Sequence, residues 1–310
     1  MSSVNPHQFA GPGEVFLDHA AIFVDEFDRS GVALERLGFT LTPFRAHTSA
    51  LRPGEPLKPL GTGNRCAMLR VGFIEVLGAT AETPMAAQLR SQLARYPGWH
   101  LIAFSAHNAE EHHAALQSEG LDPVPIARLE RSQAMPEGDN EIRASIVRLK
   151  PEAWPEGRVQ IVFPAMSPDQ MWHPSLVHHA NGADRLSEML VIVSEPAARA
   201  EQFARFTRRT LRAAGRRFVL ELDRGRVHFA PPDALVSMVP ALQAPALPYI
   251  AAVAIGCTDL DATRQLLEAR NIAFRVHQRT LQLAASESLG ATLIFHDRAD
   301  DRVFDALDPG

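Results

Sequence analysis

One succession of elements recurs four times along these 310 residues, and this repeat constrains the fold more than any other feature. Its first copy places a strand at residues 18–27, a helix at 28–39 and three strands at 39–44, 66–71 and 72–78. The strands are apolar runs rich in Val, Ile, Leu and Phe, and Gly38 is a suitable residue to end the helix. The repeating unit is therefore β-α-β-β-β.

The second copy has a strand at 99–108, a helix from Asn108 to Gly120, and strands at 123–130, 141–149 and 157–163. The third and fourth copies begin near Arg185 and Pro248, with helices at 197–211 and 261–270. We expect an α+β fold of four βαβββ modules, paired into two cupped mixed-sheet domains at 15–165 and 185–297. Residues 166–184 form the joint, because they are rich in Pro, Ser, Asn and His and break the periodicity.

The composition narrows the class of protein. Hydrophobic residues make up 46% of the chain, enough for a sizeable core, and the net charge of −5 favours neither nucleic acid nor an anionic membrane as partner. The first residues lack the features of a signal peptide, and the two cysteines imply no disulfide framework. We expect a cytoplasmic protein, monomer or homodimer, whose partner is a small-molecule substrate.

Polar residues coincide when the first two modules are overlaid. His19 falls on His100 in the first strands, and Glu75 falls on Gln160 in the last strands, at separations of 75 − 19 = 56 and 160 − 100 = 60. Glu75 is a carboxylate inside an apolar strand, where burial is costly without a partner. Two imidazoles, a carboxylate and an amide oxygen could hold a divalent metal, Fe, Mn, Co, Ni or Zn. Taken singly, each His is also explained as a hydrogen-bonded core residue, and Glu75 as one half of a salt bridge.

At these residues the chain resembles the vicinal oxygen chelate superfamily, which includes glyoxalases and extradiol dioxygenases. The segment 173–196, HPSLVHHANGADRLSEMLVIVSEP, is similar to glyoxalase-like proteins of the "HxNGA" type. The resemblance implies paired βαβββ modules cupped around a divalent metal, with His19, Glu75, His100 and Gln160 at the ligand positions. It also implies a lyase or isomerase that chelates a small oxygen-bearing substrate and stabilises an enediolate-like anion, with Glu75 as the catalytic base.

Two alternative functions stay open. The first is an extradiol-type dioxygenase with Fe(II) held by His19, Glu75 and His100. The second is a metal-free protein that sequesters a small compound, in which Glu75 pairs with a basic residue such as Arg70 or Arg158.

The second half of the chain offers fewer ligands. Glu188 and His228 stand where His19 and Glu75 stand in the first module, but the fourth module offers only Ile250 and Leu293. We therefore interpret this half as a scaffold or degenerate copy, in which Glu188 and His228 could form a buried hydrogen bond. The joint carries three histidines that could gate the site, act as acid or base, or belong to a solvated linker: His173, His178 and His179.

Overall fold

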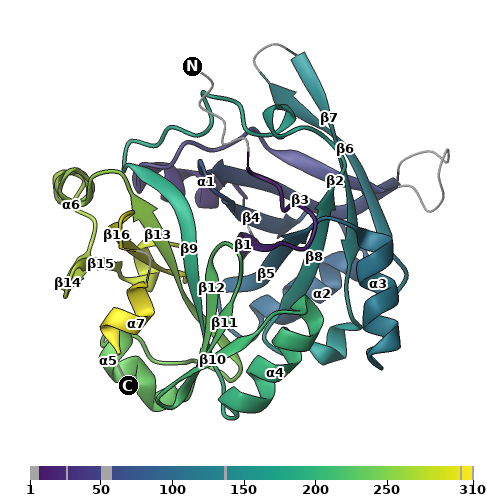
Figure 1. Cartoon of the computed structure of the whole chain (residues 1–310). Helices are drawn as coiled ribbons and strands as arrows, with labels where there is room; N and C mark the ends of the chain where they lie inside the picture. The colour runs from purple at the N-terminus through teal and green to yellow at the C-terminus, as the bar shows by residue number, and fades with distance from the viewer. Residues whose placement is uncertain (1–6, 26, 50–57, 136–137, 301, 309–310) are drawn as a thin grey trace.

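The computed structural model describes residues 7–25, 27–49, 58–135, 138–300 and 302–308, which form two eight-stranded sheets (Figure 1). The first sheet has the order β2-β3-β4-β1-β5-β8-β7-β6. Its strands are β1 (Val15–Val24), β2 (Arg45–Ser49), β3 (Lys58–Met68), β4 (Phe73–Ala79), β5 (Gly98–Ala106), β6 (Ala127–Met135), β7 (Gly138–Val147) and β8 (Arg158–Pro164). The helices of this half are α1 (Phe27–Arg36), α2 (Pro84–Leu93) and α3 (Ala109–Ser118).

The second sheet repeats this arrangement with the order β10-β11-β12-β9-β13-β16-β15-β14. Its strands are β9 (Ala183–Ile192), β10 (Leu211–Ala214), β11 (Arg217–Glu221), β12 (Arg226–Ala230), β13 (Tyr249–Cys257), β14 (Phe274–His277), β15 (Thr280–Leu283) and β16 (Thr292–Asp297). The helices of this half are α4 (Pro196–Thr207), α5 (Leu235–Met238), α6 (Leu260–Ala269) and α7 (Val303–Leu307).

The predicted α+β fold of four βαβββ modules in two mixed sheets is confirmed. In each half the first strands of two modules pair antiparallel, β1 with β5 and β9 with β13. Each first strand also pairs in parallel with the last strand of its own module, as β1 does with β4 and β5 with β8. This pairing places two related modules around an approximate twofold axis between β1 and β5.

Local sequence signals placed the elements well where caps are strong. The side chain of Asn108 accepts a hydrogen bond from the backbone N–H of Glu111 at the start of α3, and Gly120 follows its end with φ +77°. The prediction of a strand at 39–44 is wrong. Residues 39–44 form no strand of the sheet, and β2 begins only at Arg45. Helices α2 and α7 carry no sequence prediction.

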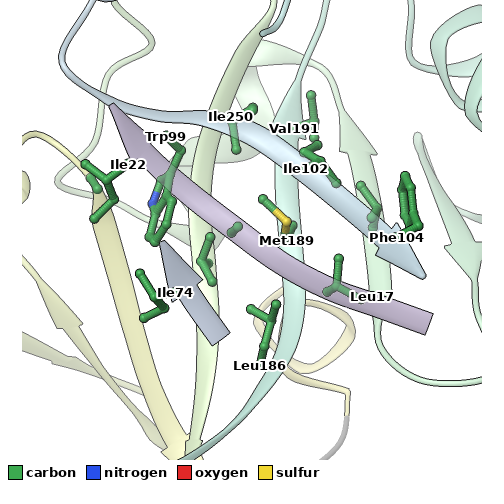
Figure 2. Close-up of a cluster of buried hydrophobic side chains, with 14 of the residues drawn as sticks. Leu17, Ile22, Ile74, Trp99, Ile102, Phe104, Leu186, Met189, Val191 and Ile250 are labelled. Atoms are coloured by element: carbon green, nitrogen blue, oxygen red, sulfur yellow. The ribbon is translucent and has the colours of Figure 1, made fainter. Parts of the chain in front are cut away.

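The two sheets pack against each other through one shared hydrophobic core (Figure 2). Leu17, Ile22 and Ile102 of the first sheet meet Met189 and Val191 of the second, and all five are fully buried. Alternation along the strands sends the other residues of β1, β4 and β5 to the opposite, concave face of the first sheet. Both sheets contribute residues to this core, so the core does not separate the chain into domains. The division at 15–165, 166–184 and 185–297 stays a prediction.

Two further expectations concern the whole chain. Cys66 and Cys257 are both buried free thiols, as the absence of a disulfide framework predicted. Among the described residues, every helix is too short or too polar to cross a lipid bilayer.

Candidate functional site

A cavity of about 200 Å³ lies in the concave face of the first sheet. Strands from both modules form its walls, α2 contributes Met85, and the joint contributes Met166, Met171 and Trp172. Its surface is mostly apolar, and the polar exceptions are few: Asp18, His19, His47, Asn64, Glu75, Arg128, Arg148, Arg158 and Gln160. Three of the four predicted ligands, His19, Glu75 and Gln160, therefore line one cavity.

Two carboxylates flank the imidazole of His19. Its Nδ1 lies 2.6 Å from Oδ2 of Asp18, and its Nε2 lies 3.8 Å from Oε2 of Glu75. Because a carboxylate accepts, the Nδ1–H of His19 donates to Asp18, and Nε2 is left facing Glu75 across the cavity surface. The ring also stacks on Phe73, with centroids 4.3 Å apart, so both its tautomer and its orientation are fixed.

Glu75 accepts a hydrogen bond within its apolar strand, and its charge also acts on the guanidinium of Arg158. Its Oε1 accepts a hydrogen bond from the amide of Asn64 at 2.5 Å and lies 4.0 Å from Nε2 of His47. Sequence reasoning missed Asn64 and His47, although Asn64 stands in a glycine-containing strand, β3, that pairs with the strand of Glu75. Of the basic partners considered, Arg70 instead lies 3.5 Å from Asp184.

The structure does not bring His100 into the cavity, which corrects the predicted ligand set. His100 is fully buried away from the cavity, its Nε2 lies 2.7 Å from the carbonyl oxygen of Tyr96, and its ring stacks on Tyr96. Burial lowers the pKa of His100 to about 4, so its imidazole is neutral and donates to that carbonyl.

A β-bulge explains this error. Ala21 pairs with Leu101, whereas Ile22 pairs with Trp99, so His100 is an extra residue in β5 with no partner in β1. Such a bulge interrupts the alternation of faces, and the residue after it, Leu101, points into the cavity.

The approximate twofold axis identifies the true counterpart of His19. His19 lies level with the residue two places before Glu75 in β4, and Leu101 lies level with the residue two places before Gln160 in β8. Leu101 therefore occupies the position of His19 in the second module. His100 corresponds to Asp18, which is itself the extra residue of a bulge in β1.

The donor set does not fit a resident divalent metal. Within the part of the chain that the structure describes, no three His, Cys, Asp or Glu side chains are arranged to hold a metal ion. An apolar Leu101 stands where the second module should supply a ligand, and the amide of Gln160 alone is a weak substitute. The dioxygenase alternative requires His19, Glu75 and His100 as iron ligands, and the position of His100 outside the cavity removes one of the three.

The three joint histidines lie outside the cavity. His179 is pinned to the first module, since its Nδ1 accepts from the N–H of Thr40 at 3.0 Å and its Nε2 donates to the carbonyl of Met68 at 2.9 Å. Burial lowers the pKa of His179 to about 4, which agrees with this neutral tautomer. The ring of His173 lies 2.7 Å from Oγ of Ser175, and the ring of His178 lies 2.7 Å from the carbonyl oxygen of Pro174. Of the joint residues that line the cavity, Trp172 is buried and packs edge-on against Phe73.

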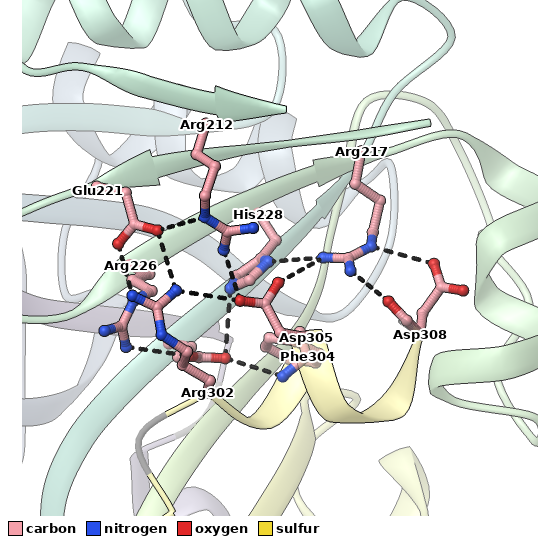
Figure 3. A network of polar contacts seen from close by, with 10 residues as sticks. Arg212, Arg217, Glu221, Arg226, His228, Arg302, Phe304, Asp305 and Asp308 are labelled. Carbon is pink, nitrogen blue, oxygen red and sulfur yellow. Dashed lines mark hydrogen bonds and ion pairs between the residues drawn. The ribbon is translucent and has the colours of Figure 1, made fainter. Parts of the chain in front are cut away.

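In the second half, Glu188 and His228 are both fully buried, and His228 belongs to the network of polar contacts in Figure 3. Oε2 of Glu188 is 3.3 Å from Nε2 of His228 and accepts from the N–H of Phe304 at 3.0 Å. Burial alone would raise the pKa of the Glu188 carboxyl, but His228, this N–H and Arg226 hold the pKa below its usual value. Arg217 donates a hydrogen bond to Nδ1 of His228 at 3.1 Å. The side chains of Glu188 and His228 are therefore both held by neighbouring polar groups of the second half.

Helix α7 fills the concave face of the second sheet. Phe304 is fully buried and packs edge-on to His228, while Val303 and Leu307 join the apolar cluster on that face. In the fourth module the residues level with Leu101 and Gln160 are Ala252 and Ile294. They lie two places from the expected Ile250 and one place from the expected Leu293, and are equally unable to bind a metal.

The fold defines a paired-module, cup-shaped α+β protein with a largely apolar cavity in its first half. The chain matches the glyoxalase-like domain model over residues 17–207, more than half of its length. It therefore belongs to the glyoxalase-like domain family, within the vicinal oxygen chelate superfamily. No curated protein sequence matches it.

Solved structures share the fold at low sequence identity. A hypothetical protein from Staphylococcus aureus is 12% identical with a TM-score of 0.63, over 91% of this chain and 99% of that one. The Mn(II)-bound glyoxalase from Novosphingobium aromaticivorans is 11% identical with a TM-score of 0.51, over 93% and 86%. Homoprotocatechuate 2,3-dioxygenase from Arthrobacter globiformis is 11% identical with a TM-score of 0.53, over 94% and 83%.

Proposed function

We propose that this protein is an enzyme that moves a proton on a small carbonyl compound, in a lyase or isomerase reaction of the glyoxalase type. The observation that carries the proposal is the alignment of Asp18, His19 and Glu75 within the main cavity of the first sheet. An oriented imidazole facing a carboxylate in a largely apolar site is a common arrangement for general acid–base catalysis.

Glu75 is the proposed base. Its Oε2 takes a proton from the carbon next to the carbonyl group, and the electron pair left behind moves onto the carbonyl oxygen to give an enolate. Asn64 holds the other carboxylate oxygen, so Oε2 is the atom directed toward His19. Return of the proton to a different atom, or loss of a leaving group from the enolate, completes an isomerisation or an elimination.

His19 is the proposed proton carrier beside Glu75. Its Nε2 can accept the proton from Glu75 and deliver it to the substrate oxygen, because Asp18 keeps the Nδ1 proton on the opposite side of the ring. The gap of 3.8 Å between Nε2 and Oε2 is longer than a hydrogen bond, as is common before a substrate is bound. Gln160, across the cavity, offers an amide N–H to the oxygen on which charge develops.

Exchange of carbon-bound hydrogen with solvent tests this proposal directly. The protein would be incubated in D₂O with a panel of aryl 2-oxo acids and α-hydroxyketones, and loss of the α-proton signal would be followed by NMR. We expect exchange with at least one compound, and a loss of about 10²–10⁴-fold in Glu75→Gln. Glu152→Gln, at an exposed carboxylate far from the cavity lining, is the matched control. Exchange at the same rate in Glu75→Gln, or no exchange with any compound, would refute the assignment.

A metal-free sequestering protein is the second candidate. Its support is the apolar wall of the cavity together with Leu101 at the place of a ligand. It predicts that panel compounds bind to the wild-type protein and to Glu75→Gln with similar affinity, without any exchange.

A further inference from the structure

Besides the exposed Arg128, two arginine side chains stand in the cavity wall of the second module. Arg158 is the first residue of β8 and lies on the same face as Gln160, and Arg148 directly follows β7. Both are only partly exposed. Within the described part of the chain, neither guanidinium has an acidic hydrogen-bonding partner, whereas Arg212, Arg217 and Arg226 in the other half are each paired with carboxylates.

This arrangement costs stability in the empty protein. Burial and the neighbouring Arg148 lower the pKa of Arg158 to about 10, while Glu75 acts in the opposite direction. Burial also lowers the pKa of Arg148. Both groups stay charged at neutral pH, so two like charges face one partly dry cavity, and the charge of Glu75 offsets their repulsion only in part.

The charges of the cavity are separated between its two walls. The carboxylates of Asp18 and Glu75 belong to β1 and β4 of the first module, whereas the arginines belong to the second module. Gln160 is two residues from Arg158 on the same strand face, a spacing of roughly 6.6 Å. A ligand of a few ångströms in length can thus touch the basic wall at one end and the acid–base pair at the other.

The cavity continues past the arginines. Arg148 and Arg158 also line a second cavity of about 160 Å³, whose other lining residues include Phe23, Leu89 and Trp154. The guanidinium of Arg158 lies 5.9 Å from the ring centre of Phe23. The apolar surfaces on both sides suit a hydrophobic body, and the paired guanidinium forks suit the two oxygens of a carboxylate.

We propose that the cup binds a small organic anion, in which an aromatic or aliphatic body carries one carboxylate held by Arg148 and Arg158. The inference rests on the proposed function for the orientation of this ligand: the carboxylate lies on the arginines and the reactive carbon lies near Glu75. Carboxylate-bearing compounds such as 2-oxo acids are therefore the substrate class.

Binding of a matched acid and amide tests the inference separately from catalysis. The probes are 3-phenylpropanoate and its neutral isostere 3-phenylpropanamide, titrated by calorimetry into the wild-type protein, Arg148→Met, Arg158→Met and the double variant. We expect the wild-type protein to prefer the acid by at least about tenfold, and each arginine variant to lose most of that preference. Arg264→Met is the control, because Arg264 lies outside the cavity lining, is exposed and pairs with Glu268 at 2.8 Å.

Two further measurements keep the outcomes distinct. Glu75→Gln should retain the preference for the acid even though it loses proton exchange, so a failure of catalysis does not hide the binding result. Methionine in place of either arginine removes an unpaired charge, so the melting temperature of these variants should equal or exceed that of the wild type. Equal affinity for acid and amide, binding of neither at millimolar concentration, or a preference that survives in the double variant would overturn the proposal. A competition experiment gives one more outcome. If inorganic phosphate displaced bound 3-phenylpropanoate as effectively as unlabelled 3-phenylpropanoate does, the assignment to a carboxylate with an apolar body would also be overturned.

Discussion

Leu101→His should convert the cup into a metal site, because Leu101 stands at the twofold counterpart of His19. The variant would place imidazoles at residues 19 and 101, opposite Glu75 and Gln160. This is the four-ligand set predicted from the sequence, with residue 101 in the place that the prediction gave to His100. We expect Co²⁺ or Zn²⁺ to bind the variant and to bind the wild-type protein weakly or not at all.

The cost and the rescue can both be worked out. Leu101 is 1% exposed. Loss of its burial removes about 1.5–3 kcal/mol, and an imidazole without a partner adds about 1 kcal/mol, so the empty variant should be less stable by about 2.5–4 kcal/mol. For a chain of this size that is a fall in melting temperature of about 4–6 °C. Metal at 100 times its Kd restores about 2.7 kcal/mol, which is most of the loss.

Differential scanning calorimetry with and without Co²⁺ measures both effects. The control is Ile102→His, the same chemical change one residue along on the face that packs into the shared core, where no other ligand is available. It should be destabilised without rescue by metal. If Co²⁺ stabilised the wild-type protein as strongly as Leu101→His, and if His100→Ala removed that effect, our placement of His100 outside the site would be wrong.

Three other predictions follow from single side chains. His19→Gln should abolish proton exchange, whereas His100→Gln should change stability but leave the exchange rate within a few-fold, as measured by NMR. Burial raises the pKa of Glu156 to about 7 against the pull of Arg199, so the folded state binds this proton more tightly than the unfolded state. Stability is then lost as the pH rises from about 4.5 to 7, by about 3 kcal/mol in total, and Glu156→Gln should raise the melting temperature more at pH 8 than at pH 5. Trp172→Ala should cost about 3–5 kcal/mol in urea unfolding and weaken binding in the cup, since Trp172 is buried against the cavity wall; unchanged binding would show that the joint is not part of the site.

The repeat predicted the architecture because strand and helix periodicity survive in each copy. The first strands predicted at 18–27 and 99–108, and the copies predicted to begin near Arg185 and Pro248, start within three residues of β1, β5, β9 and β13. Periodicity also located Glu75 and Gln160, which lie in regular strands without an irregularity before them.

The misplaced ligand shows where this reasoning fails. The face of the sheet to which a side chain points is inferred from the alternation of residues along the strand. One bulge therefore reverses the predicted face of every residue beyond it. The bulge at His100 carries no sequence signal of its own, since glycine and proline are absent between residues 99 and 106. Contacts between strands that are distant in sequence, such as Asn64 with Glu75, were equally invisible until the sheet register was known.

The two halves differ in what covers the same concave face, and this difference explains why only one retains a cavity for a ligand. In the second half, Glu188 and His228 keep the register of His19 and Glu75, but α7 fills the cup, Arg226 lies 3.3 Å from Glu188 and Arg217 donates to Nδ1 of His228. A polar pair that is covered and surrounded by balancing charges belongs to the fold. In the first half the cup is bordered by a tryptophan from the joint, and neither Arg148 nor Arg158 forms an ion pair within the described chain. Charges that destabilise the empty protein and face a cavity are what a binding site requires, because a ligand of opposite charge then gains the energy that the protein alone cannot recover.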